Sequence, residues 1–391
     1  MIYIHVPFCH RKCAYCAFYS VAGGDRDTYI EALCREIRAR HLFFGSENWR
    51  PRTLYLGGGT PSLLTFGQLQ RLSDTLRTWF DLSGLEEATL ECNPEDLTEI
   101  YLEQLQSLQL FDRISIGTQS FNDSQLRKMN RRHTSQQARN AIRNADKAGF
   151  RKISIDLIYG LPNQSTTDWE HELYEVEKLN ETLSRPIGHL SCYALTLESG
   201  TILERQVGNG QVTLADDDQQ VKHYEALRKW SLTAGYSQYE ISNFALPGQQ
   251  SRHNSRYWNR VPYLGLGAAA HSFDGHCRRW NIANVARYTA SAIAGPVEYE
   301  EEELTVRDAF NEYVMTALRT TAGIDCRQVP TPMAAYLKDA IRPFITQGWI
   351  TQTATHYKPT PSGLLMADRM AAELFITSPP QESEEDPVTE A

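Results

Sequence analysis

The chain has 391 residues, a net charge of −9 and 41% hydrophobic residues. This length exceeds one ordinary single-core domain and favours a barrel with a small second domain. The acidic balance argues against nucleic acid as a partner, because phosphate binding needs a basic surface. No apolar run reaches the roughly 20 residues of a membrane helix, and the first residues lack the pattern of a signal peptide, so we expect a cytoplasmic protein.

Short β-branched and aliphatic runs alternate with segments of helical apolar spacing in the first half of the chain. Strands that alternate with helices predict a parallel sheet, because parallel neighbours need a crossover. Six such units favour an open or partial (β/α)6 barrel over a doubly wound sheet, and in both folds the working face is the C-terminal edge of the strands. The predicted strands are 2–6, 53–56, 88–91, 113–117, 152–158 and 189–194, and the predicted helices are 29–42, 66–80, 98–108, 135–148 and 168–179.

The pattern loosens after residue 194. We expect a helix over 215–233, a short strand over 237–241 and an aromatic, glycine-rich stretch over 253–273. The acidic run 298–303 is interpreted as a domain boundary, so the first domain is expected to span residues 1–297.

The last hundred residues predict a small helical, winged-helix-like domain over 298–377, followed by a disordered acidic tail over 378–391. Because the charge of this small domain is mixed, protein contacts or intramolecular packing fit it better than DNA binding. Its predicted helices are 309–319, 334–347 and 363–375, with a hairpin formed by 348–350 and 356–358.

Three of the eight cysteines, Cys9, Cys13 and Cys16, follow the first predicted strand. Zinc sites usually need four ligands, often as two pairs, and no second pair is present. Three cysteines on one loop suit a [4Fe-4S] cluster whose remaining iron is open to chelate S-adenosylmethionine (SAM). The other five cysteines are interpreted as small buried hydrophobes, namely Cys34, Cys92, Cys192, Cys277 and Cys326.

The spacing C-x3-C-x-aromatic-C, with Tyr15 as the aromatic residue, resembles the radical SAM superfamily. The preceding Tyr3-x-His5-x-Pro7-Phe8-Cys9 is similar to the branch that contains oxygen-independent coproporphyrinogen III oxidase and the haem chaperone HemW family. The resemblance covers the chain up to its tail. It implies a cluster on the three cysteines, SAM beside it, and an electron donor of the flavodoxin or ferredoxin type.

Polar residues and glycines stand where the predicted strands end. The turn Gly57-Gly58-Gly59-Thr60 lets backbone groups approach a ligand, and a guanidinium at Arg131 could pair with the SAM carboxylate or with Asp156. At the same edge of successive strands, ligand binding fits these residues better than strand ends satisfied by backbone. The resemblance assigns SAM to Tyr3, Tyr15, Gly58, Gly59, Thr60, Glu91, Gln119, Arg131, Asp156 and Ala194.

Two features separate the chaperone from the decarboxylase. The decarboxylase has a fourth cysteine where this chain has Phe18, and a long segment before the cluster where this chain has eight residues. A third pointer is His253-Asn254-x-x-Tyr257-Trp258, which resembles the H-N-x-x-Y-W haem signature of the chaperone.

In that signature His253 would be the axial ligand, Tyr257 and Trp258 the walls, and Arg252 and Arg256 the cations for the propionates. The alternative is a surface histidine beside two packing aromatics.

We therefore expect a haem chaperone that binds a [4Fe-4S] cluster, SAM and haem. It would deliver haem to haem-requiring proteins, respiratory ones among them, with transient contact with membrane proteins. The competing hypotheses are an oxygen-independent coproporphyrinogen III oxidase and a radical SAM enzyme with another substrate. No residue is assigned a catalytic role, and the sequence leaves the oligomeric state open.

Overall fold

The computed structural model describes residues 1–46 and 49–377. The chain divides into two compact units, Met1–Glu303 and Leu304–Ala391. The division falls after the acidic run, because β14 (Tyr299–Glu303) pairs with β13 (Cys277–Asn281) and so belongs to the first unit. The tail predicted over 378–391 lies outside the described residues.

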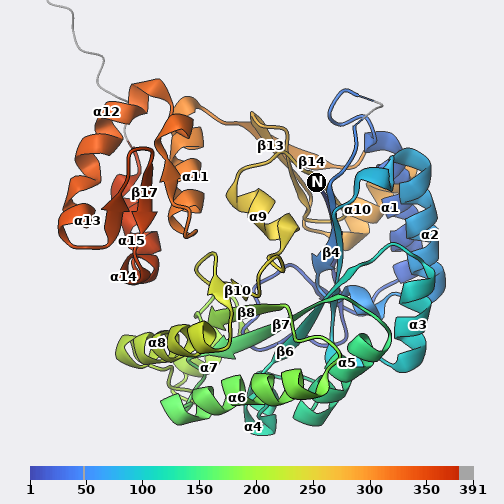
Figure 1. Cartoon of the computed structure of the whole chain (residues 1–391). Helices are drawn as coiled ribbons and strands as arrows, with labels where there is room; N and C mark the ends of the chain where they lie inside the picture. Colours follow the sequence, from blue (N-terminus) through green and yellow to red (C-terminus); the bar gives the residue numbers. More distant parts are fainter. Residues whose placement is uncertain (47–48, 378–391) are drawn as a thin grey trace, which may run out of the picture. The chain divides into compact units, whose positions relative to one another are not determined.

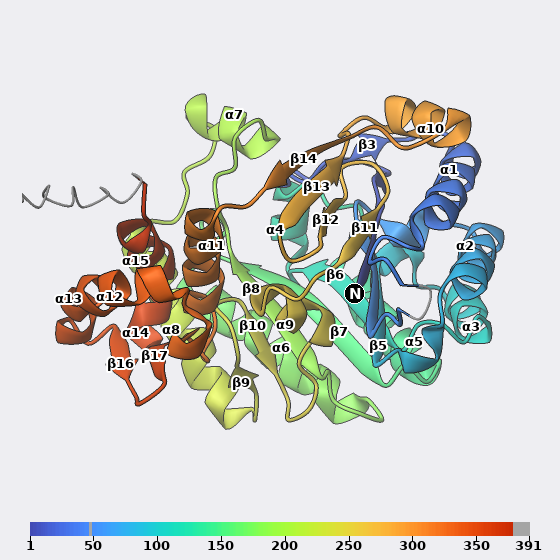
Figure 2. The ribbon, with the colours of Figure 1, turned by 90° about the horizontal axis from the view of Figure 1, so that it is seen from above.

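The first unit is built on a nine-stranded sheet with the order β11-β1-β4-β5-β6-β7-β8-β10-β9. The strands from β11 to β8 run parallel, and β10 and β9 are antiparallel additions at one edge. From β1 to β8 the spatial order follows the chain order, without the reversal of a doubly wound sheet. This arrangement confirms the predicted α/β class, with a sheet curved as in a partial barrel (Figures 1 and 2).

The six strands predicted in the first half of the chain agree with the structure to within two residues at each end, whereas β9 ends three residues before the predicted end of 237–241. The strands of the large sheet are β1 (Ile2–Val6), β4 (Thr53–Gly58), β5 (Glu87–Cys92), β6 (Arg113–Gln119), β7 (Lys152–Tyr159), β8 (His189–Ala194), β9 (Ser237–Gln238), β10 (Asn243–Ala245) and β11 (Leu264–Leu266). Two smaller sheets join β2 (Phe8–Cys9) to β3 (Val21–Ala22), and β12 (His271–Phe273) to β13 and β14.

The long helices lie along the outer side of the sheet (Figures 1 and 2). They are α1 (Arg26–Arg40), α2 (Phe66–Trp79), α3 (Glu99–Ser107), α5 (Ser135–Lys147), α6 (Thr166–Thr182) and α8 (Asp217–Thr233). Side-chain caps set their beginnings, as in the capping box formed by Thr65 and Gln68 at α2. The sequence patterns missed the shorter helices α4 (Asp123–Lys128), α7 (Ile202–Gly208), α9 (Arg252–Trp258) and α10 (Val285–Ala294).

The two faces of the sheet differ in polarity. Leu54, Leu56, Leu90, Ile114 and Ile155 are fully buried in one core with the outer helices. Side chains alternate along a strand, so the intervening positions face the inside of the curve, and they are polar: Tyr55, Glu91, Ser115, Asp156 and Ser191. The inner face of this sheet is therefore suited to a polar ligand rather than to an apolar core.

The second unit has its own core and contains both helices and a small sheet. Its helices are α11 (Val306–Leu318), α12 (Thr331–Ala340), α13 (Arg342–Thr346), α14 (Pro361–Leu365) and α15 (Ala367–Leu374), and its sheet has the order β15 (Ile324–Asp325), β17 (His356–Pro359), β16 (Ile350–Gln352). The single helix predicted over 334–347 is wrong, because a proline interrupts the helical hydrogen bonding and Pro343 stands in the first turn of α13. In the described part of the chain, no helix combines the length and apolar character needed to cross a bilayer.

A buried carboxylate joins α1 to the segment that follows β11. Glu36 accepts hydrogen bonds from Arg40 (3.1 Å), the Gly267 backbone N–H (2.8 Å), Asn281 (2.7 Å) and Tyr288 (2.7 Å). All of its acceptor positions are used, which is what a buried charge requires. This network ties α1, β13 and α10 to the edge of the barrel next to β1.

We expect Glu36→Ala to lower the free energy of unfolding by about 3 kcal/mol, because Arg40 would remain buried without its carboxylate. Urea denaturation followed by circular dichroism measures the change. The control is Glu31→Ala on the same helix, where the ion pair with Arg35 is exposed and worth about 0–1 kcal/mol. Equal losses in both variants would contradict the structural role of Glu36.

Candidate functional site

The three clustered cysteines lie on the loop after β1, and all three are partly exposed. The loop is held by backbone hydrogen bonds from the Ala14 N–H to Met129 O (3.0 Å) and from the Leu203 N–H to Ala14 O (2.8 Å). The side chain of Asn130 donates to Lys12 O at 2.8 Å. Two elements that the sequence patterns missed, α4 and α7, therefore brace the cysteine loop.

Arg131 connects this loop to the ends of two strands. Its Nη1 donates to Cys13 Sγ at 3.4 Å, and its Nη2 donates to Asn93 Oδ1 at 2.8 Å and to Gly117 O at 2.6 Å. Burial disfavours the charged form, but Tyr15 and Cys13 hold the pKa of Arg131 above its usual range, so the guanidinium is a permanent cation. No direct hydrogen bond joins Arg131 to Asp156 among the described contacts; its partners are instead Cys13, Asn93 and Gly117.

Asn93 is a site residue that the sequence analysis missed. Its Nδ2 donates to Thr60 Oγ1 at 3.3 Å, and Thr60 Oγ1 donates to Cys9 Sγ at 3.6 Å. A chain of side-chain hydrogen bonds thus runs from Cys9 through Thr60, Asn93 and Arg131 to Cys13. The position of Asn93 directly after β5 was the available signal, the same one that singled out Glu91.

Glu91 faces the inside of the barrel and contacts the glycine turn. Its carboxylate accepts from Tyr55 Oη at 2.6 Å and from the Gly58 N–H at 3.0 Å, and burial raises its pKa. Gly58 has φ +109°, and a Cβ there would lie 2.5 Å from the His5 ring. A Cβ on Gly59 would lie 2.7 Å from Phe8 O, so these glycines also let the turn pack against β1 and β2.

Asp156 faces the same interior. Burial and the nearby Glu91 raise the pKa of Asp156 to about 7, although hydrogen bonding and Arg131 act in the opposite direction. Two partly buried carboxylates close enough to repel each other are costly without a compensating positive charge. Glu91 and Asp156 together are therefore suited to bind a ligand that carries a positive charge or hydroxyl groups.

The remaining predicted SAM residues sit at the same edge or directly below it. Gln119 ends β6 at a shift in strand register and has the unusual φ of +63°, and Ala194 ends β8. The Tyr3 hydroxyl lies 3.1 Å from His5 Nδ1. Since His5 Nε2 contacts the carbonyl of Tyr19 at 3.1 Å, Nε2 carries the proton and Tyr3 donates to Nδ1.

A pocket of about 300 Å³ opens beside Tyr15. Its lining combines apolar side chains with side-chain amides, a threonine hydroxyl and the ammonium group of Lys128. Its lining includes Ala14, Tyr15, Gln125, Met129, Leu161, Pro162, Asn163, Leu195, Leu203 and Gln206. A flat ring with polar edges fits such a lining.

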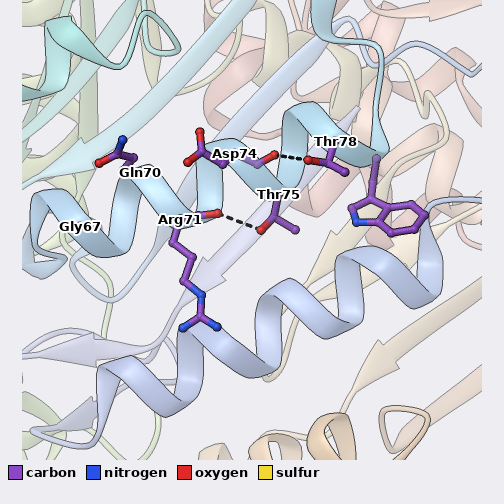
Figure 3. Close-up of a pocket in the computed structure, with 7 residues that line it drawn as sticks. Gly67, Gln70, Arg71, Asp74, Thr75 and Thr78 are labelled. Atoms are coloured by element: carbon purple, nitrogen blue, oxygen red, sulfur yellow. Dashed lines mark hydrogen bonds between the residues drawn. The ribbon is translucent and has the colours of Figure 1, made fainter.

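A second, shallower hollow lies on the outside of the molecule (Figure 3). Its walls come from one helix, α2, where Thr75 and Thr78 donate to the backbone carbonyls of Arg71 and Asp74 at 2.8 Å. It contains no residue of the predicted site and is on the helical side of the sheet.

The histidine of the predicted haem signature is buried inside the barrel, not on the surface. His253 is 0% exposed, its Nδ1 lies 2.9 Å from Thr53 Oγ1, and its Nε2 lies 3.3 Å from Tyr257 Oη. Its ring stacks on Tyr55 at 5.0 Å, and burial lowers its pKa to about 3. Thr53 begins β4, so His253 is at the end of the strands opposite to the cysteine loop. The alternative of a surface histidine is wrong.

Of the other members of the signature, Tyr257 contacts His253 directly. Asn254, Tyr257 and Trp258 are partly exposed on α9, and the Tyr257 ring meets His253 edge-on at 5.0 Å. Arg252 and Arg256 both contact Glu86, at 3.0 and 3.2 Å, and Arg52 contacts the same carboxylate. Three arginines on one carboxylate leave a surplus of positive charge beside α9.

The isolated cysteines follow the prediction only in part. Cys92 and Cys192 are buried, Cys34 and Cys277 are partly exposed, and Cys326 is exposed. The interpretation of Cys326 as a buried hydrophobe is wrong, because it lies at the surface turn of the 3-10 helix η4 (Cys326–Gln328) of the second unit.

The residues of the cysteine loop and the strand edge fit a [4Fe-4S] cluster with SAM beside it. Cys9, Cys13 and Cys16 are free thiols on one braced loop, and the buried Arg131 Nε has no hydrogen-bond partner among the described residues. No three His, Cys, Asp or Glu side chains in residues 1–46 and 49–377 group around a single metal ion; a cubane offers each cysteine a separate iron. When bound, such a cluster supplies an electron to SAM.

Similar proteins agree with this geometry. Residues 3–173 match the radical SAM superfamily, and residues 304–366 match the HemN C-terminal domain. The chain is 37% identical to "Heme chaperone HemW" of Lactococcus lactis, over 82% of each chain, and 32% identical to "Heme chaperone HemW" of Escherichia coli, over 96% of this chain and 97% of the relative. The solved structure of Escherichia coli coproporphyrinogen III oxidase (HemN), a radical SAM enzyme, aligns with a TM-score of 0.80 at 24% identity, over 95% of this chain and 89% of that one.

The fold and the cysteine loop therefore define a radical SAM protein. Within that superfamily, the chain belongs to the HemW family.

We expect Cys13→Ser to abolish the brown chromophore and the iron content of the anaerobically reconstituted protein, because a thiolate ligand is lost. Iron analysis, visible absorption and electron paramagnetic resonance measure the loss. Cys326→Ser, an exposed cysteine in the second unit, is the control and should retain both. Equal loss in the two variants would show that the cluster is elsewhere.

The raised pKa of Asp156 predicts a pH-dependent stability. An unfolded aspartate titrates near pH 3.9, whereas burial and Glu91 raise the pKa of Asp156 to about 7 in the fold. The folded state therefore holds the proton more tightly, and ionisation destabilises it as the pH rises from about 4 to about 7. Asp156→Asn, which cannot ionise, should gain thermal stability relative to the wild type over this range.

Melting temperatures of both proteins at about pH 5 and about pH 8 test this expectation. Asp218→Asn, on the exposed side of α8, controls for the loss of one negative charge. A stability difference between wild type and Asp156→Asn that is the same at both pH values would contradict the assignment.

Proposed function

We propose that this protein is a cytoplasmic haem chaperone that binds a [4Fe-4S] cluster, SAM and haem, and delivers haem to haem-requiring proteins, respiratory ones among them. The observation that carries the proposal is near-full-length similarity to relatives named "Heme chaperone HemW". Proteins that receive haem in a membrane would be contacted transiently.

The cysteine loop supports the chaperone over the decarboxylase. Phe18 stands where the decarboxylase pattern has a fourth cysteine, and it is 71% exposed. The likeness to the HemN structure, at 24% identity, concerns the fold. We therefore keep coproporphyrinogen decarboxylation as the alternative to be tested and not as the main proposal.

The polar inner face supports SAM binding above β4 to β8. Glu91 and Asp156 offer negative charge, Arg131 offers a cation and a free Nε donor, and the pocket beside Tyr15 offers apolar walls for the adenine. We assign the SAM amino group to the side of Glu91 and the glycine turn, and the SAM carboxylate to Arg131.

Haem binding through His253 requires a rearrangement. Its Nε2 is covered by the Tyr257 hydroxyl at 3.3 Å, and the ring is 0% exposed. We propose that α9 opens so that His253 leaves Thr53 and Tyr257 and becomes an axial ligand, while the surplus charge of Arg52, Arg252 and Arg256 attracts the propionates. The neutral imidazole that burial enforces is the form that binds iron.

We expect the reconstituted protein to bind haem and to form no protoporphyrinogen from coproporphyrinogen, with cluster, SAM and reductant present. Titration of haem by Soret absorption and turnover by chromatography are measured on the same preparation. His253→Ala should weaken haem binding and leave the cluster spectrum unchanged, because the two sites are at opposite ends of the strands. Tyr257→Phe removes the hydroxyl that covers Nε2 and should bind haem at least as tightly as the wild type.

Multiple turnovers of coproporphyrinogen would overturn the proposal in favour of the enzyme. Undiminished haem affinity in His253→Ala would move the axial ligand to another residue, with the exposed His271 as the next candidate.

A further inference from the structure

Basic side chains gather around the cysteine loop, although the whole chain carries a net charge of −9. Two segments supply them, residues 10–12 of the loop itself and residues 127–132 at the end of α4 and beyond it. Neither segment contains an aspartate or a glutamate. The exposed members, called here the basic rim, are His10, Arg11, Lys12, Arg127, Lys128 and Arg132.

The two segments form one surface. The side chain of Asn130 donates to Lys12 O at 2.8 Å, and Arg11 Nη2 donates to Arg131 O at 3.2 Å. The Ala14 N–H donates to Met129 O at 3.0 Å. These bonds hold the cations of both segments side by side, around the loop that carries the three cysteines.

The rim is only partly neutralised, because Asp96 is near His10 and Arg132, and Asp123 is near Arg127. Among the residues that the structure describes, Arg132 has a carboxylate within 4 Å, Glu95 at 3.9 Å, and the other arginines and the lysines of the rim have none. Like charges concentrated on one exposed patch create a positive potential that steers an acidic partner toward it.

An exposed apolar side chain follows the third cysteine of the loop in the sequence. Phe18, two residues after Cys16, is 71% exposed. Protein interfaces commonly combine aromatic anchors with a charged or polar rim. Phe18 and the basic rim together have this composition.

We infer that the basic rim and Phe18 form the docking surface for an acidic one-electron donor protein of the flavodoxin type. The donor's cofactor would face the cysteine loop, where its hydroquinone gives one electron to the oxidised cluster and becomes a semiquinone, while the cluster becomes reduced by one electron. This inference rests on the radical SAM cluster and is independent of haem binding.

The test uses the full-length protein with its cluster reconstituted anaerobically, and an acidic bacterial flavodoxin as the probe. Lys12→Glu combined with Arg127→Glu reverses two exposed charges of the rim. Lys222→Glu combined with Lys229→Glu on α8 is the matched control, since both lysines are exposed and the change in net charge is the same. Affinity for oxidised flavodoxin is measured at low and high salt, and cluster reduction is followed after mixing with flavodoxin hydroquinone.

We expect the rim variant to lose about tenfold or more of the flavodoxin affinity at low salt and to show a flatter salt dependence. Cluster reduction by flavodoxin should slow correspondingly, whereas reduction by photoreduced 5-deazariboflavin, a small uncharged donor, should not change. The control variant should behave as the wild type, and haem affinity should be the same in all three proteins.

Unchanged flavodoxin affinity in the rim variant, or an equal loss in the control, would overturn the inference. If Lys12→Glu disturbs the cluster spectrum, the flavodoxin affinity is measured instead for Arg127→Glu alone and for the neutral double variant Lys12→Gln with Arg127→Gln. An unaltered salt dependence in both of these would also overturn it.

Discussion

The arrangement of the site depends on one partly buried cation, Arg131. Its guanidinium reaches Cys13, Asn93 and Gly117 at once, so it fixes the cysteine loop relative to the ends of β5 and β6. A lysine could not do the same, because its single ammonium lacks the planar fork that addresses three partners in different directions. Asn93 and Thr60 extend this constraint to Cys9, and the loop is thereby positioned by the sheet and not by its own residues.

A second constraint runs through the barrel from one end to the other. The hydroxyl of Tyr55 donates a hydrogen bond to Glu91 at 2.6 Å, and its ring stacks on the His253 ring with the ring centroids 5.0 Å apart. The residue expected to bind SAM and the residue expected to bind haem thus share one neighbour, although they lie at opposite ends of β4. Any movement that frees His253 removes a stacking partner from Tyr55. Because Tyr55 also contacts Glu91, such a movement would change the surroundings of a residue at the other end of the barrel.

The strands, the long helices and the strand-edge residues were predictable, because hydrophobic periodicity and the position of polar residues at strand ends are local properties of the sequence. Glu91, Asp156 and Gly58 were found in this way. Asn93 and Tyr55 were not, since their importance comes from partners many residues away. The burial of His253 could not be predicted either, because the motif His253-Asn254-x-x-Tyr257-Trp258 is compatible with an exposed helix as well as with a buried histidine. In the structure, His253 of α9 lies in the interior between Thr53 and Tyr257.

The polar inner face has an energetic cost that the outer core offsets. Burial raises the pKa of Glu91 and of Asp156, and the nearby Glu91 raises the pKa of Asp156 further. The aliphatic residues on the opposite face, buried against α1, α2, α3, α5 and α6, supply the stability that tolerates this arrangement. A positively charged ligand held between the two carboxylates would relieve their repulsion, so the site is built to be more favourable with such a ligand than without it. This is the sense in which the alternation of apolar and polar residues along each strand encodes both the fold and its binding site.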